Sequence, residues 1–197
     1  MSFFLEAPLF TRRQILETPD IVPAARGVYA WFFRRLPPGV PAEGCHDRHG
    51  MKLLYVGISP KDDRSRQTLR RRIVYHLRGN AEGSTLRLTL GTLLTPVSGF
   101  PLRRVGSGRR LTFTHAGEQW LDAWLEDNAA VCWISDPEPW ALERSLLANT
   151  SLPLNIQHNR DHPFCAHLTL ARQQAKADAI ALPIANEGNQ QRRWAPD

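Results

Sequence analysis

The sequence predicts a small α/β (α+β) sandwich, in which a central, mainly antiparallel sheet of about three strands is flanked by helices. Two short segments, 27–33 and 53–58, are apolar, rich in aromatic and β-branched residues and bounded by turn residues, which is typical of paired strands. Helical spacing of apolar residues dominates the rest, with one further strand-like segment at 129–134. This order of elements indicates a layered domain whose helices cover a sheet.

The 197 residues are enough for a single domain with a real core. We expect an N-terminal segment at 1–23, a main domain at 24–160, and a C-terminal helix with a flexible tail at 161–197. Two long connections, at 34–50 and 95–112, are rich in Gly, Pro or Arg and interrupt the main domain as insertions. Insertions of this length are often functional.

The two strands at 27–33 and 53–58 should form a hairpin, and each carries one tyrosine. Because side chains alternate along a strand, Tyr29 should share a face with Trp31. By the same rule Tyr55 should share a face with Leu53 and Gly57, so that a position without a side chain lies beside its ring.

The first long helix is expected at about 67–78, because Leu69, Ile73 and Leu77 recur at helical spacing, and Gly79 should end it with a left-handed cap. The other expected elements are a short helix at 11–16, a helix from Ser84 that ends before Pro96, a loop at 97–110, a short strand at 111–113, a helix at 116–127, the strand at 129–134, a helix that starts at Asp136-Pro137 and a last helix at 163–176.

The chain carries 25 Lys and Arg against 19 Asp and Glu, which gives a net charge of +6. The arginines concentrate around the first long helix and in the 95–112 connection. Such clusters favour a polyanionic partner, and nucleic acid, most simply DNA, is the natural one. The alternative is a solvated basic face without a binding role. The arginines that we predict to contact nucleic acid are Arg64, Arg66, Arg70, Arg71, Arg78, Arg103, Arg104, Arg109 and Arg110.

Several cellular settings are disfavoured. No apolar run approaches the roughly 20 residues that span a bilayer. The first residues lack the basic segment of a signal peptide. Three scattered cysteines do not make a disulfide framework. We therefore expect a soluble, cytoplasmic protein that does not bind a membrane.

Two groups of Cys and His residues have the residue types that bind zinc, although neither has a paired Cys-x-x-Cys spacing. Ordinary loop and helix-start residues are the alternative, and His158 or His162 could also line the rim of an active site. The first group is Cys45, His46 and His49, and the second is His158, His162, Cys165 and His167.

Six polar residues follow one another on elements of matching type, in the order Tyr29, Tyr55, Arg72, His76, Glu143 and Asn155. Over roughly 24–160 the chain resembles the GIY-YIG nuclease superfamily. Gly27-Val28-Tyr29 and Tyr55-Val56-Gly57 stand for the two triplets, each with Val in place of Ile. Arg72 with His76 four residues on resembles the family's helix motif, Glu143 its metal-binding glutamate and Asn155 its closing asparagine. The connection between the triplets is longer than is usual for the family, as is the stretch before Glu143.

The resemblance implies a metal-dependent endonuclease. Tyr29 is then the candidate general base, Tyr55 positions the water or the phosphate, and His76 bonds a tyrosine or carries a proton. Arg72 can bind the scissile phosphate through two N–H groups and stays charged. Glu143 is the one acid among the six, and it would hold a single Mg²⁺ or Mn²⁺. Asn155 would orient Glu143 or close the site. Whether Tyr29 or His76 takes the proton stays open at this point.

Each residue also has a structural interpretation, because strand tyrosines usually belong to the core and helical arginines and glutamates to the surface. Two other functions therefore stay open: a nucleic-acid-binding module of the same fold that does not cut, and a zinc-stabilised interaction domain. The choice between DNA and RNA, the target structure and the biological role are not predicted. The oligomeric state is also open, with a homodimer as one option.

Overall fold

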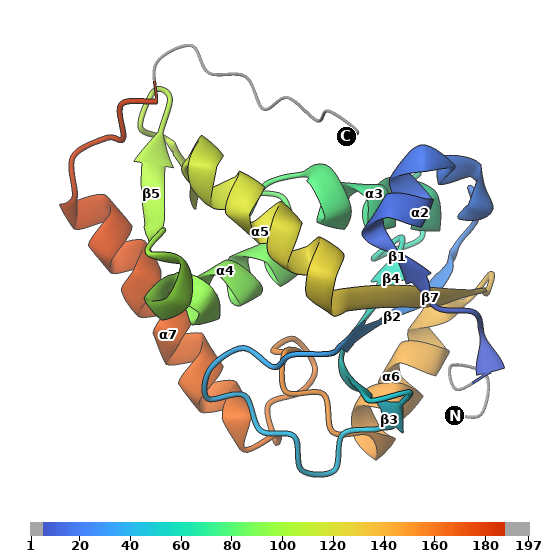
Figure 1. Ribbon diagram of the computed structural model, residues 1–197. Coiled ribbons are helices and arrows are strands. Elements are labelled where there is room, and N and C mark those ends of the chain that lie inside the picture. Colours follow the sequence, from blue (N-terminus) through green and yellow to red (C-terminus); the bar gives the residue numbers. More distant parts are fainter. Residues whose placement is uncertain (1–5, 188–197) are drawn as a thin grey trace.

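A five-stranded antiparallel sheet lies at the centre of the computed structural model, which describes residues 6–187 (Figure 1). The sheet therefore has more strands than the three expected. The expected hairpin is present as β2 and β4, and the expected later strand, β7, pairs with β2 on its other side. Two short strands complete the edges. In spatial order the strands are β1 (Phe10–Thr11), β7 (Ala129–Ser135), β2 (Gly27–Phe33), β4 (Met51–Ser59) and β3 (Asp47–Arg48).

Six α-helices surround this sheet within the described residues. They are α2 (Arg12–Glu17), α3 (Leu69–Arg78), α4 (Thr85–Ser98), α5 (His115–Asn128), α6 (Pro139–Asn149) and α7 (Phe164–Ala181), with a short 3₁₀ helix at Pro19–Ile21. None of the described helices is long and apolar enough to cross a membrane. The architecture is α+β, as expected.

The side chains of the central strands divide between two apolar clusters, one on each face of the sheet. Tyr29, Trp31 and Phe33 pack into the larger cluster, which includes residues of α3, α4 and α5. Val28 and Phe32 belong to the smaller cluster, which α6 completes. The strict alternation along β2 places its tyrosine on the same face as α3, as the pattern predicted.

The alternation along β4 is interrupted, and this corrects one expectation. The pairing of β2 with β4 shifts between Trp31 and Phe32, because Trp31 pairs with Tyr55 whereas Phe32 pairs with Leu53. Leu54 is the extra residue of this β-bulge. As a result Leu53 belongs to the smaller cluster, whereas Leu54 and Tyr55 both contact the larger one. Tyr55 and Leu53 therefore do not share a face.

Helix ends differ from the expected ones in three places. Gly79 ends α3 with φ of −77°, so its cap is not left-handed. A Cβ at Gly79 would lie 2.3 Å from the carbonyl oxygen of Tyr75, so a close approach accounts for the glycine there. Helix α4 continues through Pro96 and ends at Gly99, whose φ is +72°. Helix α6 begins at Pro139 rather than at 136–137, and the Asp136 carboxylate accepts a hydrogen bond from the Glu138 N–H in the preceding turn.

The segment at 97–110, expected as loop, contains a strand, β5 (Leu102–Val105). It pairs as a hairpin with β6 (Arg110–Phe113), which confirms the short strand expected at 111–113. Helix α7 packs along α4 and β5 (Figure 1). The chain after α7 continues along the hairpin, where the Ala185 N–H donates to the Arg104 carbonyl at 2.8 Å. The predicted flexible tail thus includes residues that bond to β5, and its remainder, 188–197, lies outside the described residues.

A buried arginine joins four helices beneath the sheet. The side chain of Arg87, on α4, is fully buried and donates to the Glu118 carboxylate at 2.6 and 2.8 Å and to Asp122 at 2.8 Å, both on α5. It also donates to the carbonyls of His76 and Leu77 at the end of α3, at 3.2 and 3.4 Å. From α2, Arg12 reaches the same Asp122 at 3.2 Å. This network sets the angle between the helices that carry the site described below.

We expect Arg87→Met to lower the free energy of unfolding by about 3–5 kcal/mol, because it leaves the buried Glu118 carboxylate without its cation. Arg110→Met is the matched control, since the Arg110–Glu82 ion pair has the same 2.8 Å separation as Arg87–Asp122 but is exposed. That control should cost less than about 1 kcal/mol. Urea denaturation measures both. Equal losses for the two variants would show that the buried network does not hold the helices.

Candidate active site

A cleft of about 410 Å³ opens between the sheet and helices α3, α4, α6 and α7. Five of the six predicted site residues line it, and they come from five separate parts of the chain. The sixth, His76, is fully buried directly behind Tyr29. The five that line the cleft are Tyr29, Tyr55, Arg72, Glu143 and Asn155. The structure therefore brings all six predicted residues together around one hollow.

Two glycines make room for the Tyr29 side chain and for the strand that carries it. A Cβ at Gly57, the cross-strand partner of Tyr29, would lie 2.5 Å from the phenol oxygen. A Cβ at Gly27 would lie 2.1 Å from the Ile134 carbonyl oxygen on β7. The phenol can therefore cross β4 only because residue 57 has no side chain. This gives the two glycines of the sequence triplets a direct steric role.

The Tyr29 phenol is hydrogen-bonded to His76, and His76 is in turn held by the N-cap of α4. The phenol oxygen lies 2.8 Å from His76 Nε2, and His76 Nδ1 lies 2.7 Å from the Ser84 hydroxyl. That hydroxyl also accepts the Arg87 backbone N–H, which caps the helix. Burial first, and then the charges of Arg72 and Arg87, lower the pKa of His76 well below its ordinary value. The imidazole is therefore neutral at physiological pH and fixed at both nitrogens.

The protonation of Tyr29 is set by competing influences. Burial raises the pKa of the phenol well above its ordinary value, and the neighbouring Tyr55 raises it further, whereas Arg72 lowers it. The rings of Tyr29 and Tyr55 are 6.5 Å apart, so the two phenols share the cleft. Without a ligand, Tyr29 is a neutral hydrogen-bonding group. A bound cation or another source of positive charge would be needed to stabilise its phenolate.

Arg72 borders the same phenol from α3. One of its terminal nitrogens donates to the Gly83 carbonyl at 2.9 Å, which orients the guanidinium. Burial alone would lower the pKa of Arg72, but Tyr29, Tyr55 and Tyr75 together raise it above its ordinary value. The side chain is therefore charged at every relevant pH, and it keeps N–H groups available for an anion in the cleft.

Glu143 faces the cleft from α6 and makes no hydrogen bond or ion pair with the residues from 6 to 187. Burial raises the pKa of its carboxyl, and His158, Lys61 and Arg144 act in the opposite direction. A partly buried carboxylate without a protein partner is suited to a hard divalent cation. No group of three or more potential metal ligands occurs in the described part of the chain. A cation at Glu143 would therefore take its other ligands from water and a bound phosphate.

Asn155, which was expected to orient Glu143 or to close the site, bonds to β4. Its side-chain amide accepts the Val56 N–H at 3.0 Å and donates to the Val56 carbonyl at 2.8 Å, so it pairs with β4 as a neighbouring strand would. It does not bond to Glu143. Because Val56 lies between Tyr55 and Gly57, this pairing fixes the segment of β4 that forms the cleft wall.

Three basic residues of the cleft were not predicted from the sequence. Lys61 precedes α3, Arg144 follows Glu143 on α6, and Arg172 reaches the cleft from α7, beyond the predicted main domain. His158, named above as a possible rim residue, lines the cleft as well. The sequence did contain a signal for Arg172. It lies seven and four residues after Cys165 and Leu168, so helical spacing places it on the face that these two buried residues share.

The predicted nucleic-acid-binding arginines separate into three groups. Arg66 and Arg71 line a second hollow of about 440 Å³, which shares Ile58, Lys61 and Arg72 with the cleft. Arg64, Arg78 and Arg109 are exposed. Four others bond to the protein itself: Arg70 to Asp20 and Val22, Arg103 and Arg104 to the carbonyls of Pro183 and Leu182, and Arg110 to Glu82. Neither hollow is lined by a residue of 34–50 or 95–112.

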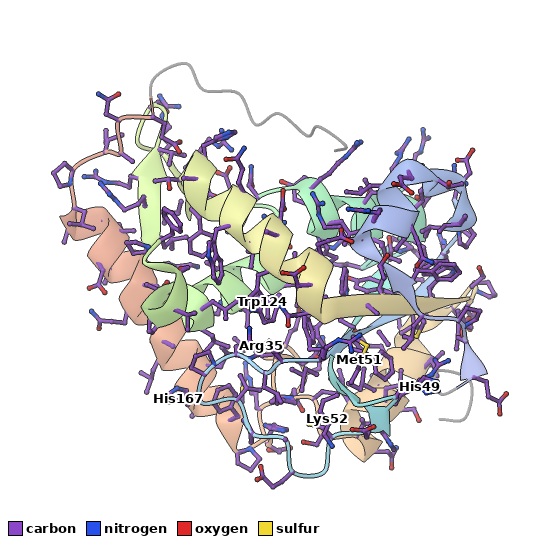
Figure 2. All side chains as sticks on the ribbon, viewed as in Figure 1. Arg35, His49, Met51, Lys52, Trp124 and His167 are labelled. Atoms are coloured by element: carbon purple, nitrogen blue, oxygen red, sulfur yellow. The ribbon has the colours of Figure 1, made fainter. Side chains whose placement is uncertain are left out.

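The Cys and His groups do not gather around a metal within residues 6–187. Figure 2 shows His49 beside β3 and His167 on α7, well apart. Cys45 and His162 meet only through Ser151, whose hydroxyl lies 3.7 Å from the thiol and 3.1 Å from His162 Nε2. Cys45 and His162 therefore link two loops through Ser151. Within residues 6–187 no cluster of three or more potential ligands supports a zinc site.

Comparison with known families gives one match. The family model described as the GIY-YIG catalytic domain matches residues 27–174, which include the whole cleft. A comparison with curated proteins and one with solved structures found no match.

The lowered pKa of His76 makes stability depend on pH. In the unfolded chain His76 has the ordinary histidine pKa of about 6.5. Below that pH the unfolded chain binds a proton at His76 that the folded chain does not. The free energy of unfolding should therefore fall as pH drops below about 6.5, by at most about 1.4 kcal/mol per pH unit from this group. Urea denaturation between about pH 5 and pH 8 measures the slope.

His76→Gln is the reference for this experiment, because glutamine can hydrogen-bond but does not titrate. The raised pKa of Glu143 has the opposite effect, because the stability that it contributes is lost as pH rises. Glu143 is present in both proteins, so its contribution cancels when the two curves are compared. The wild type should lose more stability than His76→Gln on acidification. Parallel curves would contradict a neutral, buried His76.

Proposed function

The chain belongs to the GIY-YIG catalytic domain family, and from this membership we propose that it is a divalent-metal-dependent endonuclease that hydrolyses phosphodiester bonds, most simply in DNA. The observation that carries the proposal is the Tyr29–His76 pair, 2.8 Å apart, beside the Arg72 guanidinium and a Glu143 carboxylate without a protein partner. Phosphodiester hydrolysis needs an activated water and stabilisation of phosphoryl charge. These residues supply both.

Tyr29 is the proposed general base, with His76 as its hydrogen-bond partner. The charges near the pair favour this assignment, because Arg72 lowers the pKa of the phenol while Arg72, Arg87 and Lys61 all disfavour a protonated imidazole. A neutral His76 can donate its Nε2–H to the phenolate while Nδ1 accepts the Ser84 hydroxyl hydrogen. His76 then holds the base in place rather than taking the proton itself.

Arg72 and Glu143 act on the phosphate. Arg72 keeps N–H groups that can bind two phosphate oxygens, and its bond to Gly83 fixes its orientation. Glu143 fits Mg²⁺ or Mn²⁺, because it is an oxygen ligand in a cleft and forms no bond with the described protein residues. The cation, when bound, supplies positive charge for the phosphoryl group and the leaving oxygen. Tyr55 positions the water or the phosphate from β4.

One observation favours the second candidate, a nucleic-acid-binding module of the same fold that does not cut. The pKa of Tyr29 is raised in the ligand-free protein, and a phenol that keeps its proton is not a base. The two candidates make opposite predictions in the experiments below.

We expect nicking of supercoiled plasmid in Mg²⁺ or Mn²⁺, and its loss in EDTA. Glu143→Gln and Arg72→Gln should each lower the rate by at least about 100-fold, because each removes charge stabilisation in the transition state. Gel electrophoresis of the plasmid measures the rate. Arg160→Gln is the control. It removes the same charge as Arg72→Gln, but from an exposed position outside the cleft.

Arg160→Gln should cut at nearly the wild-type rate. Salt-sensitive DNA binding by the wild type without cleavage in either metal would support the non-cutting module. Cleavage that survives both Glu143→Gln and Arg72→Gln would show that the activity does not come from this cleft.

The proposed base also predicts the pH dependence. Because the pKa of Tyr29 lies above its ordinary value of about 10, the phenolate fraction should rise tenfold per pH unit below that pKa. We expect the logarithm of the single-turnover rate to rise with pH with a slope near one up to about pH 9, and Tyr29→Phe to be inactive. A rate that is level between about pH 7 and pH 9, together with an active Tyr29→Phe, would exclude Tyr29 as the base.

A further inference from the structure

Arg172 is a charged residue on the inward face of α7. Cys165 and Leu168, seven and four residues before it, are buried, and so is Ala179, seven residues after it. At a spacing of 3.6 residues per turn these positions form one stripe, and the side chain of a stripe residue faces the rest of the protein. At Arg172 this face meets the cleft, which the side chain lines together with Tyr55 and Asn155.

The guanidinium of Arg172 has no counter-charge in the described part of the chain. It makes no hydrogen bond or ion pair with any residue from 6 to 187. Burial lowers its pKa, and Tyr55 is the one group that acts against this. By contrast, the buried Arg87 has two carboxylate partners. A partly buried cation without a partner is costly, and an anionic ligand relieves that cost.

We infer that Arg172 is a phosphate-binding residue of the cleft, supplied by the C-terminal helix, and that it contacts the nucleic-acid backbone together with Arg72. The inference rests on the proposed nuclease function for the identity of the ligand. The position of Arg172 in the cleft does not depend on that proposal. Arg172 comes from α7 and Arg72 from α3, so the two guanidinium groups approach the cleft from different elements.

The charge balance of the cleft supports a phosphodiester ligand. Its lining includes four Lys and Arg side chains, Lys61, Arg72, Arg144 and Arg172, against one acid, Glu143. A single divalent cation on Glu143 would add to the positive charge. A cleft with such an excess can accommodate more than one phosphate. Arg172 is well suited to this role because a planar guanidinium can donate two parallel hydrogen bonds to one phosphate.

Binding is tested without cleavage, using a short fluorescein-labelled DNA duplex in EDTA, followed by fluorescence anisotropy over a range of salt concentrations. We expect Arg172→Gln to weaken binding about tenfold and to reduce the slope of log K against log salt by about 0.9, the loss of one phosphate contact. Arg172→Lys should keep the slope, because the charge remains, while binding about threefold more weakly than the wild type.

Lys176→Gln is the matched control, because it removes one positive charge from the same helix at an exposed position outside the cleft. Its affinity should change less than twofold and its slope should not change. Thermal melting confirms that all variants fold. If Arg172→Gln binds like Lys176→Gln, the inference is wrong. If the wild type binds DNA through Arg172 but does not cut in Mg²⁺ or Mn²⁺, the nuclease proposal fails and the phosphate site stands.

Discussion

The buried guanidinium of Arg87 is the interaction on which the arrangement of this protein depends. All five of its N–H groups are used, on two carboxylates of α5 and on carbonyls of α3 and α5. Its own backbone N–H binds the Ser84 hydroxyl, the same group that holds His76. One residue therefore fixes the end of α3, the start of α4 and the hydrogen bond behind Tyr29. Removing one partner of such a buried charge pair is costly, because the other charge stays buried without its counter-charge.

The distribution of arginines shows why charge density along a sequence does not locate a binding site. The strongest cluster in the chain surrounds α3, yet Arg70 of that cluster binds Asp20 and Val22. Arg103 and Arg104 hold the chain after α7. Of the four Lys and Arg side chains that line the cleft, Lys61 and Arg72 come from the cluster around α3, whereas Arg144 and Arg172 come from α6 and α7. A cation is available to a ligand when the fold gives it no partner, and the fold alone decides this.

Much of the fold followed from local patterns, and the parts that did not have identifiable reasons. The strands at 27–33 and 129–135 and most helices were predicted closely, because each is long enough to show a period. Strands β1 and β3 have two residues each, which is too short for any alternation to appear. Strand β5 was missed because its two arginines bond to the carbonyls of Pro183 and Leu182, far along the chain, so that its composition resembled a loop. The bulge at Leu54 is a property of strand pairing and leaves no trace in one strand's sequence.

The six residues predicted as an ordered set lie around one cleft, although they come from distant parts of the chain. Asn155 bonds to Val56 rather than to Glu143, and this contact also lies on an edge of the sheet. Strand β3 pairs with β4 only at Met51 and Lys52, so the outer edge of β4 past that point has no neighbouring strand. The Asn155 amide and the Leu154 N–H occupy this edge at Val56 and Leu54. An open edge is a template for adding a strand from another molecule. Asn155 therefore covers the backbone groups of β4 at Val56, and without its amide they would be open to pairing with a strand of another molecule.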